Sequence, residues 1–452
     1  MTVAATTNDG WKRNLAFIWV GVFVGLLGAN FVFPFIPFFI KDLGVSDKSE
    51  VAYWTGVSGS ATGLSLTLTA PIWGALADRY GRKAMFLRAL AGAGVLIAVM
   101  GLVQEVWQFV LLRFAMGAFA GTMGAAAALV ASSTPRERVG YALGTLQTGM
   151  FSANMLGPLV GGVVAASLGI REAFFFCSAL YLTAVALVWI FVREGQAAPP
   201  PPAPDGSANR SGSLLSNLRI VVSERQVVIM LGLLFCLWLS TTFVRPVMPL
   251  SVDDFSAHLP GTSSNDDTVH LSLPWFSFDM KEEAATGVTF GVVGLTSTLA
   301  AIAIAPAGQR LGYRNSVAIA AAGSGLLFFP VALAGNFTAF LFLFGATGLF
   351  QGAMVPGTNA LIAASVPDGK QGSAFGLAAS MQSLALLLGP VAGGAVSGLF
   401  GVASVYAVIG AILLGVALGA WVLIREPEVF HRPLHGPGPP KVSGESPGKR
   451  DG

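Results

Sequence analysis

Long apolar runs dominate this sequence of 452 residues. A hydrocarbon core about 30 Å thick is crossed by about 20 helical residues, and each run reaches that length. Hydrophobic residues make up 54% of the chain and charged residues only 11%, whereas about a quarter of the residues in soluble proteins are charged. Membrane barrels use alternating segments of about ten residues, and these runs are longer and do not alternate. We therefore predict an all-α membrane protein.

The apolar runs form two sets of six. The first set is expected to span residues 15–40, 52–77, 84–103, 106–132, 140–168 and 173–192. The second set is expected at 227–250, 285–308, 315–334, 337–365, 371–399 and 402–424. The chain then divides into a bundle at 1–192, a linker rich in Pro, Gly and Ser at 193–226, a second bundle at 227–424 and a disordered tail at 425–452.

Two sequence patterns recur between the halves. The string NFVFPFIPFFI, which begins at Asn30, returns as TFVRPVMPLSV from Thr242, an offset of 212 residues. The string GPLVGG from Gly157 returns as GPVAGG from Gly389, an offset of 232. An insertion at 251–284 accounts for the longer second offset. Since each repeat has six spans, we expect the halves to be related by an axis along the membrane normal.

The distribution of charge predicts the orientation. Loops on the side of the termini hold 20 Lys and Arg residues and the opposite loops hold four, so the positive-inside rule places both termini and the linker in the cytosol. The net charge is then +9 inside and −8 outside. The overall charge of +3 therefore reports membrane topology and gives no reason to expect nucleic acid as a partner.

The loop GALADRYGRK joins the second and third spans. Glycine permits close helix approach and tight turns, and basic side chains bind the anionic leaflet. A plain helical hairpin could carry such a loop, but the string resembles the loop signature of the major facilitator superfamily. Nearly the whole chain fits the resemblance, which implies two six-helix bundles in parallel pseudo-repeat. The gating or coupling residues that it implies are Gly74, Asp78, Arg79, Gly81, Arg82 and Lys83.

The same resemblance assigns a role to Asp78. In the family this aspartate meets the amino end of span eleven, here near Gly372, and holds the cytosolic gate shut in the outward-open state. A helix amino terminus stabilises a nearby carboxylate by about 0.3 to 1 kcal/mol. The second half has Gln309 at the corresponding position, so only the first half is expected to carry this charge lock.

Arg113 lies inside the fourth span, in the string RFAMGAFAG. An arginine at bilayer depth costs about 2.5 to 3.5 kcal/mol, so it should face the bundle interior and have a function. Its repeat partner is Phe344, which argues against a symmetric packing role. The residue resembles the membrane-embedded arginine of proton-coupled antiporters and is thereby implied in proton transfer. The alternative is that Arg113 extends to the outer interface.

Small residues recur every fourth position in span five. They give one helix face a smooth surface against which another helix can pack. This is common in membrane bundles, but GMFSANMLGPLVGG resembles the antiporter motif of drug:proton exporters, with Ala153 in place of one usual glycine. The expected packing residues are Gly149, Gly157, Pro158, Gly161 and Gly162, with Gly389, Pro390, Gly393 and Gly394 in the second half.

Several polar or amphipathic residues lie at membrane depth. Arg245 is near the outer end of span seven and has Phe33 as its repeat partner; it either faces a central cavity or extends to the interface. Gln147, Met150 and Asn154 form a stripe along span five. The predicted substrate-binding residues are Asn30, Arg113, Gln147, Asn154, Trp238, Arg245, Gln351, Asn359 and Gln382.

The charge inside the spans constrains the substrate. No Asp or Glu lies well inside a span, so two arginines make the cavity positive and favour anionic or neutral amphipathic substrates. The proton carrier stays open between Asp78, Asp42 and a proton borne by the substrate near Arg113. Cys177 and Cys236 both lie in apolar runs, so we expect no disulfide framework, metal site or cofactor.

The favoured function is export of drugs or toxins across the cell membrane by proton antiport. A proton-coupled importer or a metabolite exporter of the same fold is the alternative, and a channel is not excluded. The string GVSGS resembles that of intramembrane serine proteases, but all four histidines lie in loops or the tail, so an enzyme is disfavoured. No nucleotide-binding GxxxxGK[ST] string occurs. The insertion at 251–284 could be a lid, a partner site or a disordered loop.

Overall fold

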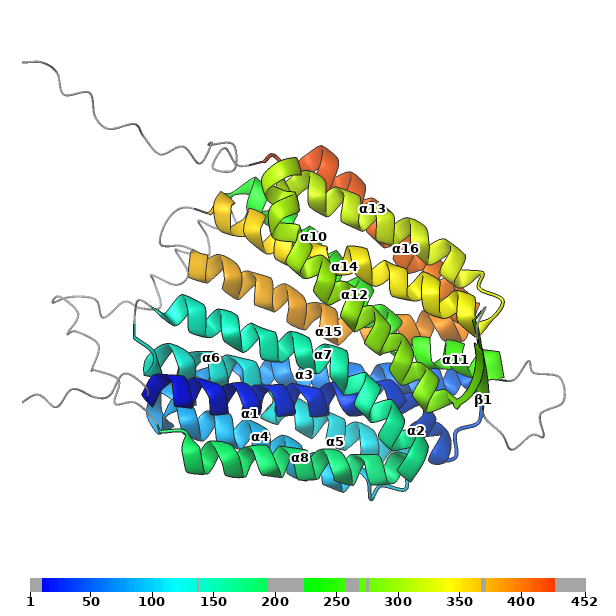
Figure 1. Cartoon of the computed structure of the whole chain (residues 1–452), viewed down its shortest axis with the longest axis horizontal. Coiled ribbons are helices and arrows are strands. Elements are labelled where there is room, and N and C mark those ends of the chain that lie inside the picture. Colours follow the sequence, from blue (N-terminus) through cyan, green and yellow to red (C-terminus); the bar gives the residue numbers. More distant parts are fainter. Residues whose placement is uncertain are drawn as a thin grey trace, which may run out of the picture.

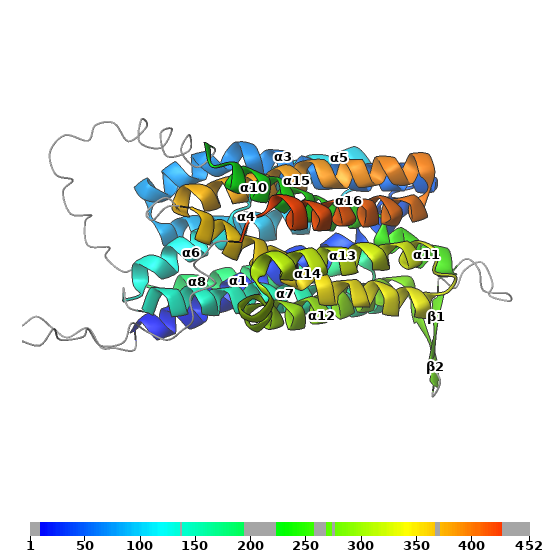
Figure 2. The ribbon, with the colours of Figure 1, turned by 90° about the horizontal axis from the view of Figure 1, so that it is seen from above.

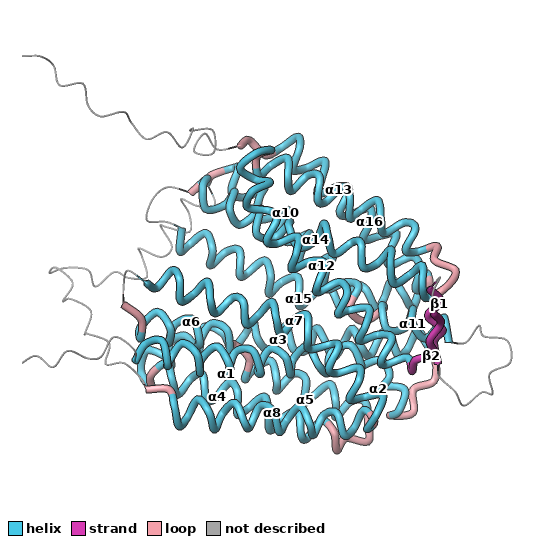
Figure 3. The backbone as a smooth tube through the Cα atoms, in the orientation of Figure 1, coloured by secondary structure: helices cyan, strands magenta, loops and turns pink. Residues whose placement is uncertain are grey.

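The computed structural model describes residues 10–135, 138–193, 223–256, 268–273, 276–366 and 371–426. These residues are almost entirely helical, with one short hairpin at one end of the molecule (Figure 3). The predicted fold class, an all-α membrane protein with two six-helix bundles, is confirmed. The hairpin was not anticipated from the sequence.

The first bundle contains the six predicted spans of the amino-terminal half. Two of them are broken. Pro34 and Pro37 interrupt the first span with a turn of 3-10 helix, and Gly121 interrupts the fourth at a φ of +106°, which favours glycine. The elements are α1 (Gly10–Val32), η1 (Phe33–Phe35), α2 (Ile36–Asp42), α3 (Lys48–Tyr80), α4 (Arg82–Met100), α5 (Val106–Phe119), α6 (Thr122–Ser133), α7 (Val139–Leu168) and α8 (Ile170–Phe191).

The second bundle repeats this order. Its first span is also broken, between α10 and α11, at the position that corresponds to the break after α1. Its helices are α10 (Arg225–Val244), α11 (Met248–Ser256), α12 (Glu282–Leu311), α13 (Tyr313–Ala332), α14 (Phe337–Ser365), α15 (Gln371–Phe400) and α16 (Val402–Leu423). By length and composition, 11 of the spans could cross a membrane, and α3, which is 33 residues long and less apolar, completes the twelve.

The two ends of the molecule differ. We call the end with α2, α11 and the strands the hairpin end, and the end where α1 and α10 begin and α8 and α16 stop the linker end. Helices of the second bundle run obliquely to those of the first and approach them at the hairpin end (Figure 1). Seen from above, the two bundles overlap (Figure 2). They meet along two pairs of helices, α3 with α15 and α7 with α12.

Glycines in the predicted packing motif set these close approaches. A Cβ atom on Gly161 would meet the carbonyl oxygen of Phe31 in α1, and one on Gly162 would meet that of Glu283 in α12. Their repeat partners behave alike: Gly393 lies against α10 and Gly394 against α3. Adjacent glycines therefore let one helix pack within its own bundle and against the other bundle.

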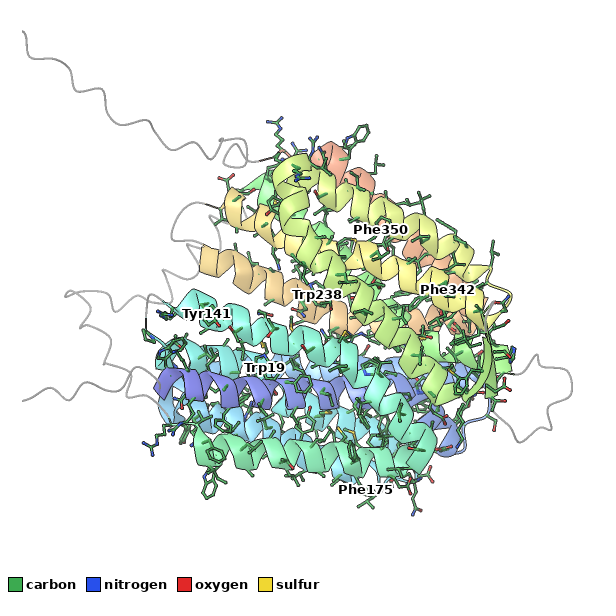
Figure 4. All side chains as sticks on the ribbon, viewed as in Figure 1. Trp19, Tyr141, Phe175, Trp238, Phe342 and Phe350 are labelled. Carbon is green, nitrogen blue, oxygen red and sulfur yellow. The ribbon has the colours of Figure 1, made fainter. Side chains whose placement is uncertain are left out.

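Large apolar side chains cover the outer surfaces of both bundles. Phe175 on α8 is 42% exposed and Phe342 on α14 is 60% exposed, and both are labelled in Figure 4. Soluble monomers rarely expose apolar surface on this scale. These faces fit contact with lipid.

The insertion contains an antiparallel hairpin of β1 (Thr268–Leu273) and β2 (Phe276–Lys281). Val269 is fully buried in the core of the second bundle, and the backbone N–H of Ser272 donates to the Thr338 hydroxyl over 2.9 Å. His270 pairs with Asp279 across the strands at 2.6 Å. The described part of the insertion is therefore folded onto the second bundle, while residues 257–267 and 274–275 lie outside the description.

Candidate functional site

Phe33 and Arg245 are equivalent positions of the two halves, and they contact each other. Arg245 caps α10 at the break before α11, and its guanidinium carbon lies 5.2 Å from the centroid of the Phe33 ring. Residues that are related by a two-fold axis and also touch must lie beside that axis. The pair therefore marks the pseudo-symmetry axis between the bundles.

Arg113 reaches the same ring from α5. Its guanidinium carbon lies 5.6 Å from the Phe33 centroid, and the residue is only 6% exposed. The Thr62 hydroxyl of α3 donates to the Arg113 carbonyl over 3.0 Å, which fixes this part of α5. Two cations, one from each bundle, thus converge on one aromatic ring.

Within the part of the chain that the structure describes, nothing neutralises the charge of these arginines. Among the described residues, no carboxylate forms an ion pair with Arg113 or Arg245, although the two guanidinium carbons lie 5.6 and 5.2 Å from the centroid of the same ring. The Nε atom of Arg113 has no hydrogen-bond partner. Buried charge without a partner is costly, so the pair forms a ready site for an anion.

A second pair of equivalent residues closes the axis toward the hairpin end. Lys41 corresponds to Asp253 at the offset of 212 residues, and its Nζ lies 2.5 Å from Asp253 Oδ1. Lys48 Nζ lies 3.1 Å from Asp253 Oδ2 and 2.5 Å from Asp254 Oδ1. We call these four residues the lysine–aspartate seam. Phe33 and Lys41 are eight residues apart, so the seam lies about 12 Å beyond the arginines along the axis.

Further polar contacts join the bundles near this end. Lys281 Nζ donates to the Ala166 carbonyl over 2.8 Å. The backbone N–H of Val391 donates to the Ser60 hydroxyl over 3.3 Å. Together with the glycine contacts of α3 and α7, they close the two bundles against each other at the hairpin end.

Part of the predicted polar stripe of α7 forms a hydrogen bond with α1. Asn30 Nδ2 donates to Asn154 Oδ1 over 2.8 Å. Asn30 lies within one turn of the proline break in α1. Gln147 is exposed two turns away on the same helix, beside Thr148, which accepts a hydrogen bond from Trp19 over 3.0 Å. This face of α7 therefore carries polar groups at Asn154 and, two turns toward the linker end, at Gln147.

The predicted residues of the second bundle are more dispersed. Gln351 donates to the Thr347 hydroxyl of its own helix over 3.1 Å. Trp238 is half-buried on α10 (Figure 4). Asn359 is half-buried and Gln382 is exposed. Neither of these last two is seen to bond to Arg113 or Arg245.

The structure describes only part of the loop motif GALADRYGRK. Gly81 has a φ of +93°, a conformation that favours glycine, and it separates α3 from α4. Lys83 Nζ donates to the Trp189 carbonyl over 2.8 Å, which ties α4 to α8. The side chains of Asp78 and Arg79, with Gly74, Gln309 and Gly372, lie outside the described residues. The proposed lock between Asp78 and α15 stays a prediction.

A cavity of about 950 Å³ opens at the hairpin end. Its lining includes Phe255, His270, Asn336 and Tyr406, and it belongs to the second bundle and the hairpin alone. It does not include the arginines, and it reaches the lysine–aspartate seam only through Asp254, so the axial site is the better candidate for a path between the bundles. Within the described residues, no cluster of His, Cys, Asp or Glu suited to a metal ion is found.

Reasoning from the sequence missed Phe33 and the lysine–aspartate seam. Phe33 was noted only as a repeat partner because phenylalanine is unremarkable in an apolar span. The seam had a signal: the repeat aligns Lys41–Asp42 with Asp253–Asp254, which places opposite charges at one pair of equivalent positions.

Comparison with known proteins identifies the family. The profile of the major facilitator superfamily matches residues 18–265 and 265–447. The chain belongs to the major facilitator superfamily. It is 30% identical over 428 residues to the multidrug resistance protein MdtG of Yersinia enterocolitica, which covers 94% of this chain and 96% of that protein. It is 29% identical over 424 residues to MdtG of Proteus mirabilis, which covers 93% of this chain and 98% of that protein.

Solved structures support the same fold. The nucleoside transporter NupG superposes with a TM-score of 0.72 at 13% identity, covering 91% of this chain and all of that one. The human organic anion transporter MFSD10 superposes with a TM-score of 0.59 at 18% identity, covering 91% of this chain and 99% of that one. The protein is therefore a multi-pass membrane transporter of the inner membrane and not an enzyme.

Proposed function

We propose that this transporter exports small amphipathic compounds by proton antiport, with alternating access to the axial site. The observation that carries the proposal is the placement of Arg113 and Arg245 around Phe33, on the axis where two equivalent bundles meet. Relatives that match over nearly the whole chain are named multidrug resistance proteins, and the span-five motif resembles that of drug:proton exporters. Both favour export over uptake.

The orientation is inferred from charge. The loops of the linker end carry most of the basic residues, so this end faces the cytosol and the hairpin end faces outward. The linker at 193–226 and the tail at 425–452 are then cytosolic. In this orientation, the lysine–aspartate seam closes the transporter to the outside.

Alternating access requires a second closure at the cytosolic end. We expect the Asp78 carboxylate to supply it by pairing with the amino end of α15 when the bundles rock apart at the seam. Substrate and proton then compete for one conformational cycle, because each stabilises a different state of the same two bundles.

The proton carrier must be a group that can gain and lose a proton during the transport cycle. Asp253 is poorly suited, since Lys41 and Lys48 both favour its ionised form. Asp78 at the cytosolic closure and Asp42 at the exposed end of α2 are the candidates for antiport, whereas a proton borne by the substrate beside Arg113 would move with the substrate and give no antiport. The two arginines favour anionic or neutral substrates over cations.

Expression in a bacterium that lacks its own efflux pumps tests the function. Cells should resist some members of a chemically diverse toxin panel, and a proton uncoupler should restore toxin accumulation. An Arg113→Ala variant at equal membrane abundance is the control and should not protect. Increased sensitivity to the panel would indicate uptake, and resistance that the uncoupler does not affect would contradict proton coupling.

A further inference from the structure

We propose that a groove between α13 and α16 at the linker end binds one anionic phospholipid, with the phosphate of its head group on Arg314 and an acyl chain against Trp421. This site lies on the outer surface of the second bundle and is separate from the axial site. The groove has a volume of about 350 Å³ and is lined by Leu311, Arg314, Asn315, Ala318, Ile319 and Trp421.

The lining of the groove changes from polar to apolar along α13. Arg314 and Asn315 lie in the first turn of the helix, and Ala318 and Ile319 follow one turn further from the linker end. Residues three and four positions apart share one helix face, so these side chains form a single strip whose charge is at the end of the membrane span. A phospholipid has its groups in the same order, a charged phosphate followed by apolar chains.

The apolar part of the groove is open to the surface. Ile319 and Trp421 are exposed, and α13 and α16 pack against each other along the edge of the second bundle (Figure 1). Tryptophan is enriched where the hydrocarbon of a membrane meets the head groups. A lipid of the surrounding bilayer can therefore enter the groove from the side.

Arg314 keeps hydrogen-bond donors for a ligand. Its Nε and Nη2 both donate to Asn315 Oδ1 over 3.2 Å, and Asn315 Nδ2 donates to the Leu311 carbonyl over 3.0 Å. In the described part of the chain, the guanidinium has no other hydrogen-bond partner, which leaves Nη1 and the second hydrogen of Nη2. A guanidinium presents such paired donors to two oxygens of one phosphate.

The amino end of α13 is already occupied and does not itself provide the anion site. Glu426, which follows α16, accepts a hydrogen bond at Oε1 from the backbone N–H of Tyr313 over 2.6 Å. Arg314 is therefore the group that would hold the phosphate.

The first bundle closes the equivalent position with its own side chain. Each of the four helices concerned follows a glycine of positive φ, and counting from these glycines aligns Lys83 of α4 with Arg314 and Trp189 of α8 with Trp421. Lys83 Nζ donates to the Trp189 carbonyl over 2.8 Å, which joins the two helices directly. In the second bundle, Arg314 bonds to its neighbour Asn315 instead, and the groove lies between the equivalent helices. A lipid on Arg314 and Trp421 joins α13 to α16 in place of that direct bond.

The nearby charges favour an anionic lipid over a zwitterionic one. Arg310 in the last turn of α12 and Arg425 just after α16 are both exposed at the linker end. Basic residues beside membrane spans attract anionic lipids, whereas the ammonium group of a zwitterionic head is repelled by them.

Native mass spectrometry of the purified, delipidated full chain tests the site. Dioleoylphosphatidylglycerol is the probe, dioleoylphosphatidylcholine is the chain-matched comparator, and glycerophosphate carries the phosphate without acyl chains. The first phosphatidylglycerol should bind about tenfold more tightly than the first phosphatidylcholine, and glycerophosphate should not bind measurably. Arg314→Gln should weaken phosphatidylglycerol binding about tenfold, because it removes charged hydrogen bonds.

Arg225→Gln is the matched control. Arg225 is an exposed cation where α10 begins at the linker end, and it does not line the groove. Its replacement should leave the affinity for phosphatidylglycerol unchanged.

Two further variants separate the head group from the acyl chain. Arg314→Lys keeps the charge but lacks the paired donors, so its affinity should lie between those of the original chain and Arg314→Gln. Trp421→Ala should weaken both lipids by a similar factor, because both have the same chains. Without lipid, all variants should unfold at the temperature of the original chain, and phosphatidylglycerol should raise that temperature less in Arg314→Gln.

An unchanged affinity for phosphatidylglycerol in Arg314→Gln would overturn the site, and so would an equal loss in Arg225→Gln. Equal binding of the two lipids would overturn the preference for an anionic head group. Glycerophosphate binding as tight as that of the lipid would identify a site for free phosphate and overturn the assignment to a lipid. These measurements involve no transport, so their outcome is independent of proton antiport.

Discussion

Removing the charge of Asp253 should open the transporter at the hairpin end. The carboxylate joins the bundles through Lys41 at 2.5 Å and Lys48 at 3.1 Å, and its side chain is only 11% exposed. In Asp253→Asn, Lys48 keeps Asp254, so the main loss is the pair with Lys41. A hydrogen bond between charged groups contributes about 1.5 to 3 kcal/mol.

The lower part of that energy range applies to the pair of Lys41 with Asp253. Lys41 is 29% exposed, so water replaces part of the lost interaction. A loss of about 1.5 to 2 kcal/mol changes the ratio of closed to open molecules by a factor of roughly 10 to 30. The closed state is the one that loses the contact, so the population moves toward opening at the hairpin end.

Distances between spin labels on Leu102 and Leu333 measure this population. These repeat partners lie in loops of the hairpin end, one on each bundle, and are 64% and 84% exposed. Cys177 and Cys236 are first replaced by alanine and serine so that only the introduced cysteines carry labels. Asp253→Asn should enlarge the long-distance fraction relative to the original chain, because the seam no longer opposes separation.

Two further variants make the result decisive. Asp253→Glu retains the charge and should restore most of the short-distance fraction. Asp279→Asn removes a carboxylate whose hydrogen bond with His270 lies within the hairpin, so the distances should not change. If Asp253→Asn leaves the distribution unaltered, or Asp279→Asn alters it equally, the seam does not close the transporter.

Three other substitutions probe the remaining parts of the cycle. Asp78→Asn should insert normally but impair transport and raise cysteine labelling at the cytosolic end; wild-type transport and labelling together would exclude the lock. Arg113→Ala should abolish substrate-induced proton flux in proteoliposomes while Arg113→Lys retains part of it, and undiminished flux in the alanine variant would remove Arg113 from coupling. A Cβ on Gly162 would lie 2.8 Å from the Glu283 carbonyl oxygen, so Gly162→Val should block transport, whereas Gly144→Val on the same helix, where a Cβ meets nothing within 4 Å, should not. Equal activity would show that the contact between α7 and α12 tolerates the side chain.

Hydropathy was sufficient to predict the helical architecture. Each apolar run corresponds to one helix or to two helices in line, because a membrane span must satisfy its backbone internally and a helix does so. The break in the first span was not predicted, although Pro34 and Pro37, which cannot donate backbone hydrogen bonds, account for it. The packing of Gly162 against α12 and of Gly394 against α3 could not be predicted, because a small-residue face does not specify its partner.

The composition of the axial site was only partly visible in the sequence. Arg113 and Arg245 stand out because arginine is costly in a bilayer. Phe33 does not stand out, and its function depends on the meeting of two repeats in space. The hairpin was also hidden, since six-residue strands in a polar insertion leave too weak a pattern to separate from a loop.

Proton flux in proteoliposomes tests proton antiport most directly. Purified protein is reconstituted with an internal pH dye, and a compound from the toxin panel to which the chain confers resistance is imposed as an outward or inward gradient at zero membrane potential. Antiport predicts that substrate movement drives protons in the opposite direction, and that Arg113→Ala abolishes this flux. Substrate movement without any proton flux, or proton flux in the same direction as the substrate, would contradict the account.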